Sequence, residues 1–136
     1  MNIFFWNCQG LGNSPMVKYL RHNILTNKPL LIGIAEPKML FENCRGFKWD
    51  SFGYGFVSQN QHDINMDHLC VIKYESVQIL TVTMKSQWVL VICDHQSFKF
   101  EISFVYASSS YIKRRELWAD LEALSRNVSD KWLIMG

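Results

Sequence analysis

Apolar residues occur along the chain in short runs separated by polar turns, and their spacing predicts the order of helices and strands. A strand is expected at residues 2–7, a helix at 14–27 and a second strand at 30–35. The helix has Ser14 as its expected N-cap, apolar residues at helical spacing, and Pro29 just beyond its end. These elements predict two strands of one sheet joined by a crossover helix, with the adjacency and direction of the strands left open.

The middle of the chain is dominated by strand-like runs. Mixed signals at residues 39–52 are interpreted as a long loop. The expected strands that follow are at residues 54–59, 69–74, 77–84 and 88–94. Short polar links such as "YES" and "KSQ" join the later runs and predict antiparallel hairpins.

The last part of the chain contains the clearest alternation. In "FKFEISFVY", at residues 98–106, the apolar and aromatic positions share one face and the polar positions share the other. A helix is expected at residues 113–127, with Leu117, Leu121 and Leu124 as its buried stripe and Trp118 beside it. A short strand at residues 131–135 follows.

This order predicts an α/β fold with mixed, largely antiparallel strands and two flanking helices. The 136 residues, 49% of them hydrophobic, are enough for one domain with a buried core. The net charge is +2 and the sequence pI is about 8.4. Such a mild positive charge does not produce a broad basic surface, so a polyanion would have to be bound locally.

Cysteine usage and the absence of long apolar runs bear on the compartment. The apolar runs are strand-sized and no leader-like segment opens the chain, so we expect no membrane span or signal peptide and an intracellular protein, nuclear or cytoplasmic. Cys8, Cys44, Cys70 and Cys93 are widely spaced without a C-x-x-C pair, and we expect them to be reduced and structural. A zinc site assembled from distant segments is the less favoured alternative.

Three polar residues stand at the ends of apolar strands, namely Asn7, Glu36 and Tyr106. In open α/β sheets, functional groups tend to lie where strands end. A carboxylate such as Glu36 at the end of an apolar run is either paired or holds a cation, and Mg²⁺ often takes only one or two protein carboxylates together with a substrate phosphate. Taken singly, Glu36 is better explained by a surface ion pair with Lys38 or another cation, and Tyr106 by core packing with its hydroxyl in water, whereas Asn7 is equally well explained by a turn.

Four segments in chain order resemble the endonuclease/exonuclease/phosphatase (DNase I-like) superfamily: "FFWNCQGLGN" at residues 4–13, "LIGIAEPK" at 31–38, "FVYASSSYIKRRELWADL" at 104–121 and "KWLIMG" at 131–136. They are most similar to the endonuclease domain at the start of plant LINE-type (non-LTR) retrotransposon polyproteins. The resemblance implies a two-sheet α/β sandwich and hydrolysis of DNA phosphodiester bonds that depends on Mg²⁺, with Mn²⁺ as an alternative ion.

The resemblance also implies roles for individual residues. Asn7 resembles the family's Asn beside the metal and the scissile phosphate, and Glu36 its main metal-ligating carboxylate. Tyr106 resembles the Tyr whose hydroxyl contacts that phosphate. Pro37 stands where many members have Thr. Three basic residues are further candidate phosphate contacts: Lys38, Arg114 and Arg115.

The match covers the whole chain but only the N-terminal part of the family's domain. Gly136 aligns with the Gly of the family's Gly-Asp-x-Asn segment, and we expect residues 1–136 to be a partial domain with weakened metal binding and little or no activity. A non-catalytic DNA-binding or protein-binding module and a plain structural α/β domain are the alternatives.

One further group of residues has metal-ligand chemistry. His62, Asp63, Asp67 and His68 lie within seven residues, in "HDINMDH". Nothing in the sequence defines the geometry of this group, and a polar hairpin loop is the favoured interpretation.

Overall fold

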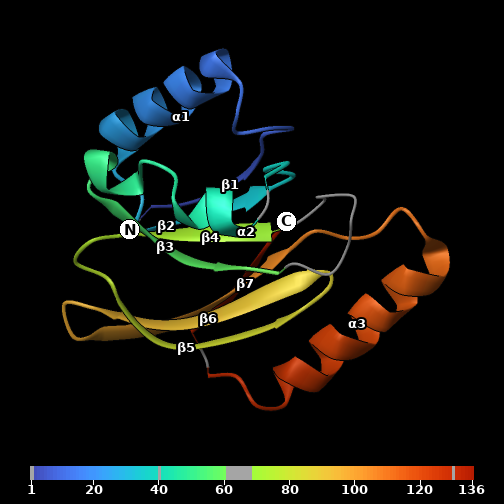
Figure 1. Ribbon diagram of the computed structural model, residues 1–136. Coiled ribbons are helices and arrows are strands. Elements are labelled where there is room, and N and C mark those ends of the chain that lie inside the picture. The colour runs from blue at the N-terminus through green and yellow to red at the C-terminus, as the bar shows by residue number, and fades with distance from the viewer. Residues whose placement is uncertain (1, 40, 61–68, 130) are drawn as a thin grey trace.

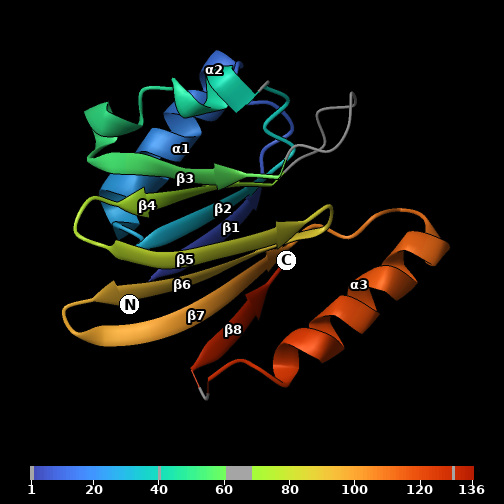
Figure 2. The same ribbon diagram turned by 60° about the horizontal axis from the view of Figure 1, so that its bottom comes forward.

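Two four-stranded sheets lie face to face, with helices on their outer faces (Figures 1 and 2). The computed structural model describes residues 2–39, 41–60, 69–129 and 131–136. The elements in chain order are β1 (Ile3–Asn7), α1 (Ser14–Asn27), β2 (Leu31–Ala35), α2 (Phe41–Arg45), a 3-10 turn (Trp49–Phe52), β3 (Tyr54–Gln59), β4 (Leu69–Tyr74), β5 (Gln78–Lys85), β6 (Trp88–His95), β7 (Phe98–Val105), α3 (Tyr111–Ser125) and β8 (Trp132–Met135).

The strand order is β1-β2-β4-β3 in the first sheet and β5-β6-β7-β8 in the second. β1 is parallel to β2, with Asn7 opposite Ala35, and β8 is parallel to β7. The other neighbouring strands are antiparallel. The expectation of an α/β fold with mixed, largely antiparallel strands is confirmed, and the open question about the first two strands is resolved as adjacent and parallel.

Alternation along the strands distributes the apolar side chains over three layers. Ile32 and Ile34 of β2 face α1, whereas Leu31 and Ala35 face the second sheet. Residues on both sides of the space between the sheets are fully buried, among them Phe104 of β7. On the outer face of the second sheet, α3 packs its leucine stripe on β6. Burial of both faces explains why β2 reads as a continuous apolar run.

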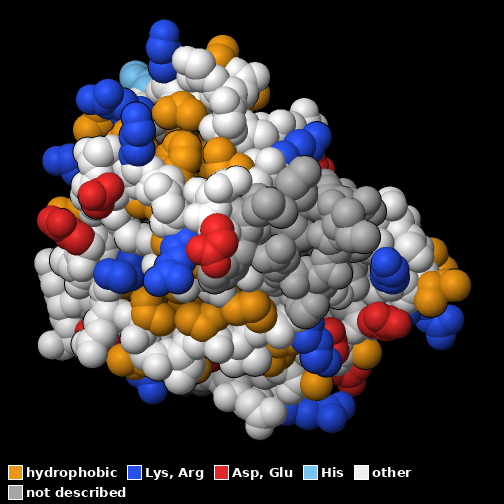
Figure 3. Space-filling model, viewed as in Figure 1, with side chains coloured by type: hydrophobic (Ala, Val, Ile, Leu, Met, Phe, Trp, Pro, Cys, Tyr) orange, Lys and Arg blue, Asp and Glu red, His pale blue; other side chains and the backbone are white. Residues whose placement is uncertain are grey.

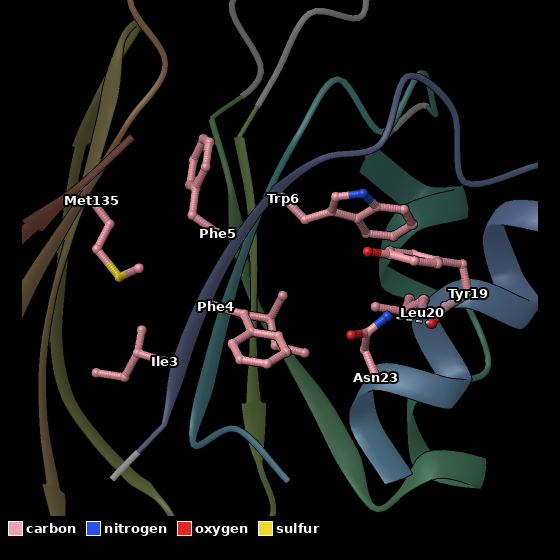
Figure 4. A pocket seen from close by; sticks show the side chains of 9 residues that line it. Ile3, Phe4, Phe5, Trp6, Tyr19, Leu20, Asn23 and Met135 are labelled. Carbon is pink, nitrogen blue, oxygen red and sulfur yellow. Dashed lines mark hydrogen bonds between the residues drawn. The ribbon is translucent and has the colours of Figure 1, made fainter. Parts of the chain in front are cut away.

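The side chains of β1, an edge strand of the first sheet, also alternate between the face toward α1 and the face toward the second sheet. In Figure 4, Phe4 and Trp6 point toward α1, and Ile3 and Phe5 point toward the second sheet, where Met135 lies. A cavity of about 320 Å³ is lined by these residues together with Tyr19, Leu20, Asn23 and Ile32. β1 and β8 are therefore the outer strands of the two sheets on the same side of the sandwich.

The loop expected at residues 39–52 is partly helical, so that prediction was wrong. Residues 41–45 form α2 and residues 49–52 form the 3-10 turn. Cys44 and Trp49 are buried, and the Trp49 indole Nε1 donates a hydrogen bond to the Cys44 carbonyl at 2.8 Å. The sequence pattern is too short to show a helical period, and tertiary packing of these two side chains determines the conformation instead.

The expected hairpin at "YES" is also wrong, because β4 and β5 belong to different sheets. Val77, in the link between them, is buried in the cluster between the sheets. The chain therefore crosses from one sheet to the other at this point. The hairpin at "KSQ" is confirmed, since Lys85 of β5 pairs with Trp88 of β6.

The helix boundaries differ from the expected ones by one or two residues. Asn13 rather than Ser14 is the N-cap residue of α1, and it makes no side-chain capping hydrogen bond. α3 begins at Tyr111, and its N-cap Ser110 accepts a hydrogen bond from the Lys113 amide. Trp118 is 64% exposed and lies outside the buried stripe. No described helix is both long and apolar enough to cross a membrane.

Two of the three polar side chains on β7, Glu101 and Ser103, are buried, whereas Lys99 is exposed. Glu101 is 6% exposed, and its Oε2 accepts a hydrogen bond from the Ser129 amide at 3.1 Å. The Ser103 hydroxyl accepts one from Trp132 Nε1 at 2.9 Å. Because both side chains have partners, their burial under the segment that leads into β8 is tolerated.

We predict that Gly33→Ala destabilises the fold. A Cβ at Gly33 would lie 2.3 Å from Cδ1 of the Phe104 ring, which is fully buried, so the ring or the backbone would have to shift within the core. Overpacking of this kind costs about 1–3 kcal/mol in the free energy of unfolding, measurable by urea titration. Gly55→Ala on β3 is the matched control, because a methyl group at that position would have no atom within 4 Å. Equal stability of the two variants would contradict the prediction.

The four cysteines are free and buried, as expected. Burial raises the pKa of Cys8, raises that of Cys70 well above its ordinary value, and raises that of Cys93 to about 12. Since the thiolate is the reactive form, we predict slow modification by Ellman's reagent at pH 8 in the native state and rapid modification in guanidinium chloride. Rapid labelling of any native cysteine would be inconsistent with this packing.

Candidate functional site

Glu36 follows β2 directly and has an unusual backbone conformation. Its φ is 52°, and Lys38, two residues later, has a φ of 49°. A left-handed conformation costs a residue with a Cβ roughly 1–2 kcal/mol, so the surrounding contacts must hold it in place. The carboxylate is thereby directed from a fully buried strand to a half-buried position at the end of the first sheet.

The segment after β1 supplies these contacts. The Cys8 amide donates to the Ala35 carbonyl at 3.1 Å, and the Leu11 amide donates to the Pro37 carbonyl at 2.9 Å. The Cys8 thiol lies 3.4 Å from the Glu36 carbonyl oxygen. Asn7, exposed and opposite Ala35 in the parallel register, is therefore at the same end of the sheet as Glu36.

Tyr106 reaches this point from the second sheet. It follows β7 directly, and its hydroxyl donates a hydrogen bond to Glu36 Oε1. The structure thus brings two of the three strand-end residues into contact although they are 70 residues apart in the sequence. β8 ends at the same edge, because Gly136 packs on the Val105 backbone, where an added Cβ would lie 2.6 Å from the Val105 carbonyl oxygen.

The basic candidates occupy different environments. Lys38 is exposed, and among the described residues Glu36 forms no ion pair with it or with another cation. Arg114 is half-buried, and its Nη1 donates to the carbonyls of Ser108 and Ser109 at 3.1 and 2.7 Å. It therefore braces the segment between β7 and α3. Arg115 is exposed on α3.

The oxygen atoms of the side chains at these strand ends are suitable ligands for a hard divalent cation. A carboxylate has two oxygens, and the Tyr106 hydroxyl is bound to one oxygen of Glu36. Carboxylate and amide oxygens are the ligands that Mg²⁺ prefers, and one protein carboxylate is sufficient when water and phosphate complete the shell. In the described part of the chain, no group of three or more His, Cys, Asp and Glu side chains could hold a metal. The candidate cluster His62, Asp63, Asp67 and His68 lies outside the described residues.

The charged side chains are unevenly distributed on the face of the molecule in Figure 3. Several Lys and Arg side chains gather at the upper left, and elsewhere they lie among Asp and Glu side chains. The cavity in Figure 4 is apolar, and none of Asn7, Glu36 and Tyr106 lines it. The candidate catalytic residues therefore lie at the ends of the strands and not in this cavity.

Sequence reasoning missed one buried polar residue near this edge. Gln87 stands in the link between β5 and β6, is 6% exposed, and accepts a hydrogen bond from the Tyr106 amide through its carbonyl at 2.9 Å. A glutamine in the polar link "KSQ" is typical of a solvated hairpin turn, so no signal in the sequence identified it.

We predict a measurable coupling between Tyr106 and Glu36. In a double-mutant cycle of Tyr106→Phe and Glu36→Ala, the free energies of unfolding should be non-additive by about 1 kcal/mol, since each substitution alone removes the same hydrogen bond. Urea unfolding measures all four proteins. The exposed Tyr111 supplies the control, as Tyr111→Phe and Glu36→Ala should be additive. Additivity in both cycles would show that the hydrogen bond is not formed in solution.

Comparisons with known proteins give matches at the level of structure. No family model and no curated protein matches the sequence. The endonuclease domain of TRAS1, a telomere-specific non-LTR retrotransposon, superposes with a TM-score of 0.71 at 11% identity, over 97% of this chain and 56% of that one. An AP endonuclease from Archaeoglobus fulgidus has a TM-score of 0.69 at 13% identity, over 95% and 53%.

A third neighbour is TDP2 from D. rerio in complex with a single-stranded DNA product, with a TM-score of 0.66 at 15% identity, over 97% of this chain and 57% of that chain. The chain thus spans little more than half the length of the structures it matches. Identities this low establish the fold alone. The chain shares the two-sheet α/β fold of the corresponding part of these three structures.

Proposed function

We propose that Asn7, Glu36 and Tyr106 form part of a site that hydrolyses DNA phosphodiester bonds with a divalent cation, Mg²⁺ or Mn²⁺. The observation that carries this proposal is the hydrogen bond between Tyr106 and Glu36, which joins the ends of strands from two sheets. The strained backbone at Glu36 supports it, because strain of this kind concentrates at functional sites.

Each residue has a defined task in this proposal. The Glu36 carboxylate and the Asn7 amide oxygen would hold the cation, which when bound polarises a phosphoryl oxygen and offsets the charge that develops there. The Tyr106 hydroxyl donates a hydrogen bond to Glu36 in the structure and would donate one to a phosphoryl oxygen when substrate is bound. Lys38 and Arg115, both exposed, would contact neighbouring phosphates of the DNA. Arg114 would add a further phosphate contact next to the segment between β7 and α3, which it also holds in place.

The proposed substrate class is DNA, and the proposed type is the non-LTR retrotransposon endonuclease. The sequence resemblance and the likeness to the TRAS1 endonuclease domain support this type. By that resemblance, the groups that orient the attacking water and act as general base lie on later segments of the family's domain. Because general acid–base catalysis contributes about 10²–10⁴-fold, we propose that residues 1–136 are a partial domain with little or no turnover.

The test measures cation binding and strand cleavage separately. Mn²⁺ titrated into the isotope-labelled chain should broaden the amide resonances of the segments around Asn7, Glu36 and Tyr106 through paramagnetic relaxation. Glu36→Ala should abolish this broadening because it removes the carboxylate ligand. Glu75→Ala is the control, since Glu75 is an exposed carboxylate at the link between β4 and β5.

Cleavage is followed on supercoiled plasmid with Mg²⁺ or Mn²⁺. Trace nicking that EDTA and Glu36→Ala both remove would support the proposal, and nicking that survives Glu36→Ala would contradict the role of Glu36. Efficient nicking that requires Glu36 would overturn only the expectation of little or no turnover. Salt-dependent DNA affinity without cation binding would favour a non-catalytic binding module instead.

A further inference from the structure

The turn between β5 and β6 is an unusual place for a buried side chain. Ser86 and Gln87 form this two-residue link, and side chains in such links normally face solvent. Gln87 is 6% exposed, whereas Gln96, in the corresponding link at the other end of β6, is exposed. The burial of Gln87 therefore needs a structural reason.

Gln87 binds the segment that follows β7 at three points. Its backbone carbonyl accepts a hydrogen bond from the Tyr106 amide at 2.9 Å. Its side-chain Oε1 accepts one from the Ser108 amide at 2.8 Å, and its Nε2 donates to the Lys113 carbonyl at 2.7 Å. A single glutamine thus satisfies polar groups before and after the start of α3, and it determines the path of the chain from Tyr106 onward.

The turn itself is held from the first sheet by a second buried amide. Asn60, 2% exposed at the end of β3, donates through Nδ2 to the carbonyls of Lys85 and Ser86 at 2.8 and 3.1 Å. Its Oδ1 accepts a hydrogen bond from the Leu69 amide at 2.6 Å. A continuous set of hydrogen bonds therefore runs from the first sheet through the turn to Tyr106.

Two features bear on the position of the Tyr106 hydroxyl: the ring packs against the core cluster between the sheets, and this set of hydrogen bonds holds the backbone that carries the ring. The β6–β7 ladder ends with Trp88 opposite Val105, so Tyr106 is the first residue beyond it. The hydroxyl must nevertheless meet Glu36, which belongs to the other sheet. Even with the ring packed against the core, a small rotation of the Tyr106 backbone would move the distant hydroxyl away from Glu36, so the backbone must also be held in place.

We propose that Gln87 is a positioning residue that holds Tyr106 against Glu36. Its side chain fixes the segment from Ser108 to Lys113, and its carbonyl fixes the Tyr106 backbone. The consequence for phosphodiester hydrolysis rests on the proposed function, whereas the placement of Tyr106 does not. Loss of the Gln87 side-chain amide would leave the bond from the Tyr106 amide to the Gln87 carbonyl in place but free the segment from Ser108 to Lys113, and would thereby weaken the contact of the Tyr106 hydroxyl with Glu36 while leaving the sheets intact.

The experiment reads the contact directly by NMR of tyrosine labelled with ¹³C at Cζ. The chain has five tyrosines, and Tyr106→Phe identifies the resonance of Tyr106. In the wild-type background, Glu36→Gln should shift this resonance because it replaces the charged acceptor of the hydroxyl. In the Gln87→Met background, the same substitution should produce a clearly smaller shift, because the segment after Tyr106 has lost both side-chain hydrogen bonds of Gln87.

Two further variants separate positioning from folding. Gln96→Met is the matched control, and it should leave the response of Tyr106 to Glu36→Gln unchanged. Gln87→Glu keeps an acceptor for the Ser108 amide but loses the donor to the Lys113 carbonyl, and should give an intermediate response. It remains informative if Gln87→Met does not fold, which the amide spectrum would reveal.

The inference is overturned if Glu36→Gln shifts the Tyr106 resonance in folded Gln87→Met as much as it does in the wild-type background. If Gln87→Met does not fold, the same result in folded Gln87→Glu overturns it. A general loss of stability would not remove this response selectively. The NMR readout needs neither cation nor DNA, so it stands even if the chain neither binds Mn²⁺ nor cleaves plasmid. If it does cleave, Gln87→Met should lower kcat and leave KM nearly unchanged, since Gln87 acts through Tyr106 rather than on the substrate.

Discussion

The contact of the Phe104 ring with Gly33 determines how the two sheets lie against each other, and the candidate site depends on it. The ring occupies the space where any other residue at position 33 would place its Cβ, so the sheets approach closely at this point. Glu36 is three residues beyond Gly33, and Tyr106 is two residues beyond Phe104. Because strands are stiff over such short distances, the packing between the sheets is transmitted to the polar pair at their ends.

The strain at the strand ends has the same origin. β2 is buried on both faces, so its direction is set by packing and cannot adapt to the needs of Glu36. The left-handed conformation at Glu36 turns the chain abruptly, and the hydrogen bonds from Cys8 to Ala35 and from Leu11 to Pro37 hold the chain on both sides of it. The energetic cost of the turn is offset by core packing and by these bonds, which is how a rigid sheet can present a carboxylate at its edge.

Much of the fold was predictable because strong periodicity and apolar runs specify strands and helices locally. The long alternation in β7 and the crossover helix α1 are examples. The short helix α2 and the crossing from β4 to β5 were not predictable, since both depend on burial of single side chains such as Trp49 and Val77 in distant clusters. A polar link of three residues has the same appearance whether it joins strands of one sheet or of two.

The sequence predicted only those residues of the candidate site that lie at the ends of strands. Asn7, Glu36 and Tyr106 stand out because a polar residue follows an apolar run, and that pattern is local. Gln87 and Asn60 carry no such pattern, because their amides act across the space between segments that are distant in the sequence. A site that spans two sheets requires both kinds of residue: those at the strand ends carry the chemistry, and buried amides elsewhere keep the strand ends together.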